Sequence, residues 1–306
     1  MPTVLITGTS TGIGLETAIA FARKGYRIFA ALRSPAKAAL LQKAIGEGLP
    51  IVMVQMDVNN DASVSDGVSE VLAYAGAIDV LVNNAGIGVG GPLEQVSIAD
   101  SKAMFETNYF GAIRMIRAVV PRMRTRRSGA IVNVTSAAGR IAIPIHGHYA
   151  ATKFALEAAS ESLAGEMRPF GVRVAIIEPG VVLTPIFTKA ESVIDPSTPY
   201  LMAINRLWRF FATQLVDPTM ASAVADTIIE AVETETPRLR YTVGEDAAVL
   251  VAGRARISDE VWIELNAEPD EDRFVAKALE IFGADLYNPP SMFSRMRSKR
   301  TQASAG

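Results

Sequence analysis

Residues Thr3 to Gly25 read TVLITGTSTGIGLETAIAFARKG, and this stretch decides the fold. Its opening run of apolar and β-branched residues is typical of a strand buried on both faces. Gly8, Gly12 and Gly14 follow, and then a segment rich in Ala, Leu and Ile that favours a helix. Strand, glycine loop and helix in this order predict the first unit of an α/β sheet.

The same alternation of strand and helix continues along the chain. Short apolar runs that we interpret as further strands occupy residues 26–32, 51–58, 78–86, 129–136, 172–180 and 238–244. Helical patterns lie between them, and right-handed crossovers then give a doubly wound arrangement. We therefore predict one Rossmann-like α/β domain with a parallel sheet of about seven strands flanked by helices.

The predicted domain spans residues 1–250, with a helical insert at 184–216. The insert has three prolines and many aromatic side chains, so it is either ordinary helical packing or a lid over an apolar ligand. A helix is expected after Asp217 as N-cap and Pro218 in the first turn, with a core stripe of Val224, Ile228 and Val232. Residues 251–306 are expected to form a helical extension and, from the basic Ser294 segment, a flexible tail.

Composition excludes several classes of protein. The net charge of −2 does not suggest a nucleic-acid partner. The absence of cysteine excludes disulfides, thiolate zinc sites and iron–sulfur clusters, and two histidines, His146 and His148, make a histidine metal site or a Ser-His-Asp hydrolase improbable. Both histidines are expected in a loop, in a structural or substrate-facing role. No signal peptide or membrane span is evident, so we expect a soluble cytoplasmic protein.

The glycine loop predicts a dinucleotide site. Glycines let the backbone approach a pyrophosphate closely, and the following helix N-terminus favours an anion, although turns use glycine anyway. The spacing is G-x-x-x-G-x-G rather than G-x-G-x-x-G. At the end of the second strand, where NAD sites usually have an acidic residue, the chain has Arg33. Arg33 is either a solvated loop residue or the partner of a 2′-phosphate, which favours NADP(H).

Tyr149 and Lys153 are four residues apart in HGHYAATKFALEAASESLA, which begins at His146 and is mostly helical in pattern. The two side chains therefore share one face near the start of a helix. They are either an exposed surface pair or a general acid/base whose phenol pKa is lowered by the ammonium. Ser136, like Gly8, Asn84 and Pro179, ends a predicted strand. Ligands of open α/β sheets bind at that edge.

Four motifs resemble the short-chain dehydrogenase/reductase family. They are T-G-x-x-x-G-I-G at 7–14, N-N-A-G at 83–86, Ser136, and Y-x-x-x-K at 149–153, in the order and spacing that the family has. The resemblance runs from about Thr3 to Thr184. The evidence for the resemblance is the four motifs taken together, because each motif alone is only modest evidence.

The resemblance implies a role for each matching residue. Tyr149 would be the general acid/base, Lys153 would hold the nicotinamide ribose and lower the tyrosine pKa, Ser136 would bind the substrate oxygen, and Asn108 would anchor a proton-relay water. The implied cofactor contacts are Gly8, Ser10, Thr11, Gly12, Ile13 and Gly14 in the loop, Asp57 and Val58 at adenine, Asn84, Ala85 and Gly86 in the cleft, and Pro179, Gly180, Val182 and Thr184 at the nicotinamide amide, in addition to Tyr149 and Lys153.

Within the family, FAALR at 29–33, PRLRYTVG at 237–244 and the long segment after Thr184 look like the 17β-hydroxysteroid and retinol dehydrogenase branch. That likeness implies a small but bulky apolar alcohol or ketone as substrate, such as a steroid, a retinoid or another lipid. The family resemblance also implies a homodimer or homotetramer, formed through helices around residues 101–127 and 149–168. The alternative is that the long C-terminal region covers that surface or caps the substrate site.

Two other functions remain open at this point. One is a non-catalytic NADPH-binding regulatory protein on the same fold, which the presence of all four candidate catalytic residues disfavours. The other is a sugar-nucleotide epimerase or dehydratase, which the spacing of the glycine loop disfavours.

Overall fold

The computed structural model describes residues 1–185 and 197–288, and its centre is a seven-stranded sheet. The strand order is β3-β2-β1-β4-β5-β6-β7, and every neighbouring pair is parallel. All seven strands predicted from the apolar runs are confirmed. Their bounds are β1 Thr3–Thr7, β2 Arg27–Leu32, β3 Ile51–Gln55, β4 Val80–Asn83, β5 Gly129–Val134, β6 Val172–Pro179 and β7 Arg240–Val243.

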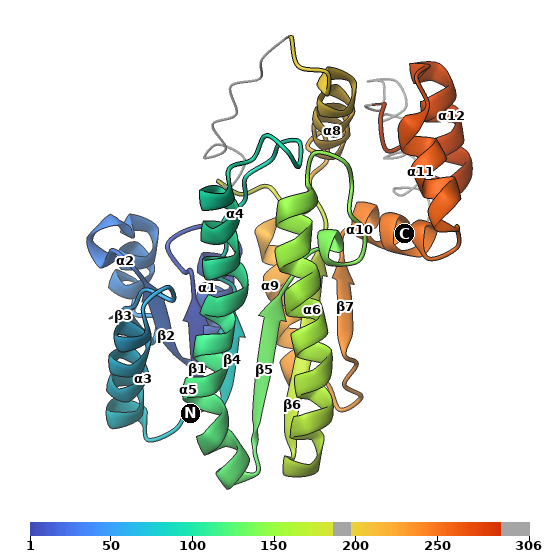
Figure 1. Ribbon diagram of the computed structural model, residues 1–306. Helices are drawn as coiled ribbons and strands as arrows, with labels where there is room; N and C mark the ends of the chain where they lie inside the picture. The colour runs from blue at the N-terminus through green and yellow to red at the C-terminus, as the bar shows by residue number, and fades with distance from the viewer. Residues whose placement is uncertain (186–196, 289–306) are drawn as a thin grey trace, which may run out of the picture.

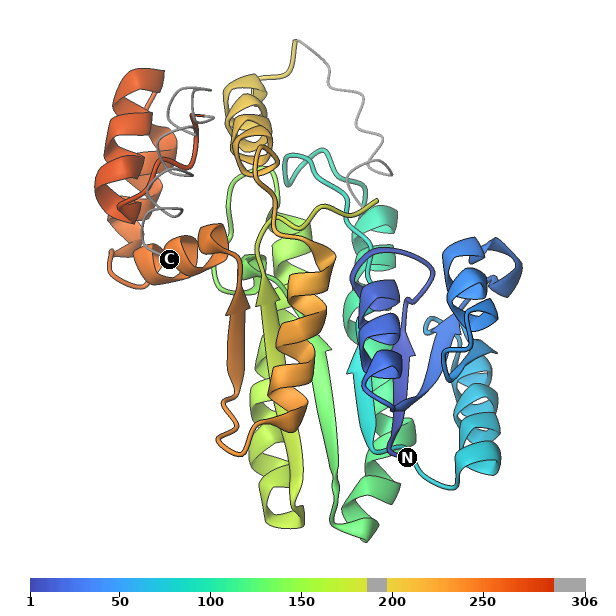
Figure 2. The same ribbon diagram turned by 180° about the vertical axis from the view of Figure 1, so that it is seen from behind.

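Helices cover both faces of the sheet (Figures 1 and 2). One face is covered by α1 (Gly12–Arg23), α2 (Ala39–Gly46) and α9 (Ala221–Glu233). The other is covered by α3 (Asp61–Ala75), α5 (Gly111–Arg126) and α6 (Gly147–Met167). A helix α4 (Ile98–Phe105) leads through a π-helical turn (Glu106–Phe110) into α5. This is the doubly wound arrangement that the sequence predicts.

Alternate residues of the inner strands enter two different cores, which is why these strands read as continuous apolar runs. In β1, Val4 and Ile6 belong to the α1/α9 face, and Leu5 belongs to the α3/α5 face. In α9, Val224 and Ile228 are fully buried, so the predicted apolar stripe of this helix is confirmed as core.

Four further helices gather at the carboxyl ends of the strands, above the sheet in Figure 1. They are α8 (Leu201–Gln214), α10 (Glu245–Arg254), α11 (Asp259–Ala267) and α12 (Glu271–Phe282). They form a third apolar cluster around Phe210, Phe274 and Phe282. The predicted extension is thus helical over α11 and α12, whereas the predicted flexible tail from Ser294 and part of the predicted lid lie outside the described residues.

Two local expectations are wrong. Helix α9 begins at Ala221 with Met220 as its N-cap, so Asp217 and Pro218 precede it. The reason is that Thr219 is held extended: it forms a parallel bridge with Val182, and its carbonyl accepts from the amide of Leu183 at 3.0 Å.

The expected loop position is correct for His146 and wrong for His148. His146 is the N-cap residue of α6, and His148 lies in the first turn of this helix. Among the described helices, none is both long enough and apolar enough to cross a membrane.

Candidate active site

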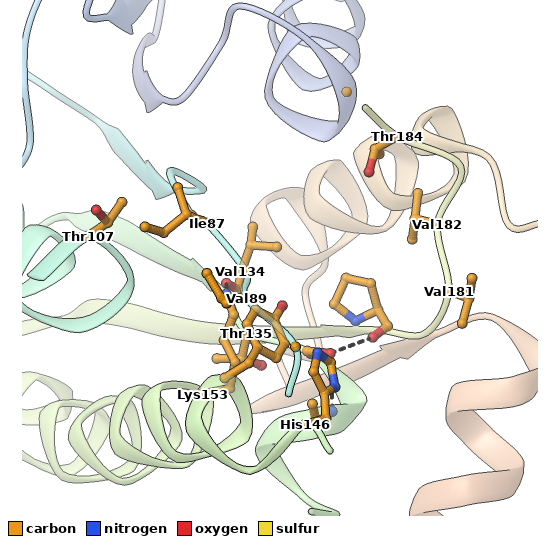
Figure 3. A pocket seen from close by; sticks show the side chains of 18 of the residues that line it. Ile87, Val89, Thr107, Val134, Thr135, His146, Lys153, Val181, Val182 and Thr184 are labelled. Atoms are coloured by element: carbon orange, nitrogen blue, oxygen red, sulfur yellow. Dashed lines mark hydrogen bonds between the residues drawn. The ribbon is translucent and has the colours of Figure 1, made fainter. Parts of the chain in front are cut away.

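A cavity of about 990 Å³ opens at the carboxyl edge of the sheet. It extends from the end of β2 to helix α8, so it joins segments that are far apart in sequence. Figure 3 shows Lys153 of α6, His146 before it, and Val182 and Thr184 after β6 around the same space. Of the residues predicted for the site, all but Gly14 and Asn108 line it, namely Gly8, Ser10, Thr11, Gly12, Ile13, Arg33, Asp57, Val58, Asn84, Ala85, Gly86, Ser136, Tyr149, Lys153, Pro179, Gly180, Val182 and Thr184.

The glycine loop has the shape of an anion cradle. Gly8 and Gly12 have φ of +72° and +61°, which side chains rarely adopt. Gly14 lies behind the lining, where a Cβ atom would be 2.4 Å from the carbonyl oxygen of Gly8. The N-cap residue of α1, Thr11, makes no capping hydrogen bond with its side chain, so the first amides of α1 are available to a ligand.

The end of β4 secures this loop from the other side. The side-chain amide of Asn84 donates to the carbonyl oxygens of Thr7 at 2.9 Å and Gly8 at 3.2 Å. The Thr7 hydroxyl in turn accepts from the amides of Asn84 and Ala85. The residues of the N-N-A-G motif thus fix the glycine loop as well as line the cavity.

Arg33 and Asp57 line the cavity at the end that is formed by the glycine loop and by the ends of β2 and β3. Arg33 is exposed directly after β2, and within the described chain it forms no ion pair. The carboxylate of Asp57 accepts from the amide of Asn59 at 3.0 Å, which holds the turn after β3. A free guanidinium at this position is available to a phosphate.

Ser136, Tyr149 and Lys153 meet in the middle of the cavity. The Ser136 hydroxyl donates to the carbonyl oxygen of Pro179 at 3.3 Å. The Lys153 Nζ donates to the carbonyl oxygen of Val134 at 3.1 Å and lies 5.6 Å from the centre of the Tyr149 ring. The alternative of an exposed surface pair is therefore wrong, since Lys153 is buried and both side chains line the cavity.

Burial sets the pKa of both groups. It raises the pKa of Tyr149 to about 12, and a hydrogen bond with Ser136 lowers it by less. Burial also lowers the pKa of Lys153 to about 8, opposed by the charge of Glu157. Lys153 is not among the causes of this shift, so the expected lowering of the tyrosine pKa by the ammonium stays a prediction. At pH 7 the tyrosine is a neutral phenol and the lysine is mainly an ammonium, which suits proton donation.

Asn108 lies in the π-helical turn and is 1% exposed. Its side-chain amide donates to the carbonyl oxygen of Ile87 at 2.9 Å and to the Thr152 hydroxyl at 3.0 Å, and its oxygen accepts from the amide of Ile87 at 2.8 Å. It thus ties the loop after β4 to α6. Asn108 lies beside the cavity and does not line it, so its role in anchoring a proton-relay water stays a prediction.

The other half of the cavity is apolar. Helix α8 contributes one side, so the insert does more than pack against the core. The apolar side chains that line this half come from the loop before α6 and from α8 and α10, namely Ile141, Ile143, Ile145, Ile204, Leu207, Trp208, Phe210, Phe211 and Leu250. Whether residues 186–196 close over them is a prediction outside the described residues.

Two lining groups were not assigned a role from the sequence. Asp246 in α10 accepts from the amide of Val181 at 2.7 Å, and a Cβ atom on Gly180 would be 2.2 Å from its carboxylate. This carboxylate therefore positions the predicted nicotinamide segment after β6.

The glycine-rich loop from Gly86 to Gly91 also lines the cavity. The high glycine content of this loop could have predicted its place in the cavity. The contact between Asp246 and Val181 could not be predicted in this way, because the two residues are far apart in the sequence.

The chemistry available here is acid/base chemistry beside a bound dinucleotide. A phenol, an ammonium and a hydroxyl converge between an anion cradle and an apolar chamber. Within residues 1–185 and 197–288, no group of three or more acidic or histidine side chains could hold a metal ion.

Comparison with known proteins agrees with this site. A model of the short chain dehydrogenase family matches residues 2–194. The chain is 36% identical to retinol dehydrogenase 8 of Bos taurus over 272 residues, covering 83% of this chain and 85% of that protein. It is 35% identical to 17-beta-hydroxysteroid dehydrogenase type 1 of Mus musculus over 252 residues, covering 78% and 72% respectively.

Solved structures show the same relationship. A short-chain dehydrogenase from Streptomyces avermitilis superposes with a TM-score of 0.76 at 32% identity, covering 87% of this chain and 95% of that one. An alcohol dehydrogenase from Thermococcus sibiricus, complexed with 5-hydroxy-NADP, has a TM-score of 0.67 at 25% identity, covering 79% and 96%.

The chain belongs to the short-chain dehydrogenase/reductase family. It is an oxidoreductase of that family, and its relatives place it near the retinol and 17β-hydroxysteroid dehydrogenase branch.

Proposed function

We propose that this protein is an NADP(H)-dependent oxidoreductase that interconverts a bulky apolar alcohol and the corresponding ketone or aldehyde. One observation carries the proposal: Ser136, Tyr149 and Lys153 lie between a glycine cradle and an apolar chamber in one cavity. The similarity to a retinol dehydrogenase and a hydroxysteroid dehydrogenase supports the substrate class.

The residues present fit the cofactor. The glycine loop and the amides that open α1 would hold the pyrophosphate, with Arg33 at the 2′-phosphate and Asp57 and Val58 at the adenine. The cleft formed by 84–86, the segment 179–184 and Lys153 would hold the nicotinamide riboside. When bound, the cofactor supplies or accepts the hydride.

The side chains of this chain handle the proton and the substrate oxygen. In reduction, Tyr149 donates its phenolic proton to the carbonyl oxygen, and Ser136 donates a second hydrogen bond where negative charge develops. The ammonium of Lys153 stabilises the phenolate that remains. In oxidation the same phenolate accepts the proton of the alcohol. The apolar chamber excludes water from these charges.

The cofactor preference is tested by replacing Arg33 with alanine. We expect the affinity for NADPH to fall by about tenfold to a hundredfold, because a charge-assisted hydrogen bond to the 2′-phosphate is lost. Titration calorimetry with NADPH and NADH measures this, and NADH binding should not change. Arg122→Ala, at an exposed arginine of α5 outside the cavity, controls for the altered net charge. Equal NADPH affinity in wild type and Arg33→Ala would make Arg33 a bystander.

The pH dependence of reduction follows from Lys153. With its pKa near 8, the ammonium is present below pH 8 and lost above it. We expect kcat/KM for NADPH, which reports the enzyme before cofactor binds, to be level below about pH 8 and to fall about tenfold per pH unit above it. Lys153→Arg keeps its charge throughout, so its profile should be level across the same range, although its rate is lower. A wild-type profile level to pH 10 would contradict the assignment.

We also propose that the protein is a homodimer or homotetramer formed through α4, α5 and α6. Phe110, at the entry to α5, is 46% exposed and Phe154 on α6 is 43% exposed, and a second copy of the chain packed on these helices would cover both. Light scattering coupled to size exclusion should give at least twice the chain mass. A single monomeric peak at micromolar concentration would contradict it. The cytoplasmic location expected from the sequence stays a prediction.

A further inference from the structure

The backbone just before α6 is strained. Ile145 has φ of +71°, in the left-handed region that a β-branched residue rarely adopts. Its carbonyl oxygen accepts from the amide of Gly91 at 2.8 Å, and the next amide, that of His146, donates to the carbonyl oxygen of Ile143 at 3.2 Å. Such strain persists only where neighbours hold it in place, and it is often found at ligand sites. Here the strained residue directly precedes His146, which lines the cavity.

The imidazole of His146 lies flat against the ring of Tyr149. The ring centres are 4.6 Å apart with an interplanar angle of 15°. Phe211 of α8 meets the same imidazole edge-on, with centres 6.0 Å apart at 84°. His146 also lines the cavity, where Figure 3 shows it near Lys153, and its ring contacts both Tyr149 and Phe211.

The imidazole nitrogens of His146 have no hydrogen-bond partner within residues 1–185 and 197–288. Its neighbour His148 differs, because Nδ1 of His148 pairs with the Ser101 hydroxyl at 3.0 Å and its Nε2 donates to the carbonyl oxygen of Leu93 at 3.0 Å. His148 therefore has a structural role through both ring nitrogens, whereas the ring nitrogens of His146 are available to a ligand.

His146 is neutral at physiological pH, since burial lowers its pKa to about 4. A neutral imidazole has one N–H donor and one acceptor nitrogen. Of the other polar side chains that line the cavity, Gln95 and Thr198 hydrogen-bond each other at 3.3 Å, and Asp246 accepts from the amide of Val181. A polar substrate group that loses its water in this part of the cavity needs a new hydrogen-bond partner, and His146 offers one donor and one acceptor.

We propose that His146 is a specificity-determining residue that hydrogen-bonds a second oxygen of the substrate, next to the reacting carbonyl. Because its ring is stacked on that of Tyr149, a group held by the imidazole lies close to a carbonyl held by the Tyr149 hydroxyl. The favoured substrates are therefore apolar molecules with an α-hydroxy ketone or α-diketone end. This inference rests on the proposed function.

The test compares two matched ketones, decan-2-one and 1-hydroxydecan-2-one, with NADPH as the reductant. The wild type should favour the hydroxyketone in kcat/KM by about tenfold, the value of one hydrogen bond. His146→Phe keeps a flat ring on Tyr149 but has no nitrogen, so the two ketones should differ by about twofold or less. His146→Asn keeps a donor and an acceptor and should retain most of the preference. Thermal melting of each variant shows that it is folded.

The outcomes separate this inference from the proposed function. A preference that survives in His146→Phe would overturn the inference, as would an equal loss on both ketones, which would mean that the ring only supports Tyr149. A failure of the wild type to reduce any ketone or aldehyde with NADPH would overturn the proposed function, and the inference with it.

Discussion

Tyr149→Phe is expected to reduce turnover by about a hundredfold to ten-thousandfold, the usual contribution of a positioned general acid. The substitution removes a single oxygen. It leaves the ring stacked on His146 and leaves Lys153 in place. NADPH binding should stay within about threefold of wild type, because the phenol acts on the substrate oxygen and the glycine loop holds the cofactor. Initial rates and calorimetry on the same preparation measure both quantities.

Tyr287→Phe is the matched control for this variant. Tyr287 is also a buried tyrosine whose pKa burial raises to about 12, but it packs against Phe274 in the C-terminal cluster, outside the cavity. This control should keep wild-type turnover. If Tyr149→Phe retained more than about a tenth of the wild-type rate, Tyr149 could not be the general acid.

Gly14→Ala is expected to weaken NADPH binding by about a hundredfold or more. The added methyl group would lie 2.4 Å from the carbonyl oxygen of Gly8 and 2.5 Å from Nδ2 of Asn84. Neither atom can move away easily. The Gly8 oxygen belongs to a backbone with φ of +72°, and the Asn84 amide is hydrogen-bonded to the carbonyl oxygens of Thr7 and Gly8. Overpacking of this kind costs about 1–3 kcal/mol, and here it displaces the loop that would hold the pyrophosphate.

Gly165→Ala controls for the change from glycine to alanine in a helix. Gly165 lies inside α6, and a Cβ atom there would meet no other atom within 4 Å. This variant should bind NADPH as the wild type does and should melt at the same or a slightly higher temperature, since alanine is the better helix former. Calorimetry and thermal melting compare the two. NADPH affinity of Gly14→Ala within about threefold of wild type would contradict the role of the loop.

The fold was predictable because most strands, such as β1, are buried on both faces and so read as nearly continuous apolar runs. That signal is local, as in Val4, Leu5 and Ile6, and it identified all seven strands. The cavity lining was predictable for a related reason. Parallel strands bring their carboxyl ends together, so that Gly8, Asn84, Ser136 and Pro179 had to converge.

Other features depend on contacts between distant segments. Met220 caps α9 because Thr219 pairs with Val182, some forty residues earlier in the chain. Burial in the folded site raises the pKa of Tyr149, whereas the spacing to Lys153 alone suggested the opposite. The stacking of His146 on Tyr149 and the left-handed backbone of Ile145 before it are likewise features that no residue preference indicates.

The most direct test of the account is turnover of a panel of apolar carbonyl compounds, with steroid ketones, retinal and long-chain ketones, followed by the loss of NADPH absorbance. The account predicts NADPH-dependent reduction of at least one bulky apolar member, with little or no turnover by Tyr149→Phe. Tight NADPH binding by the wild type without turnover of any member would contradict it and would favour a non-catalytic cofactor-binding protein instead.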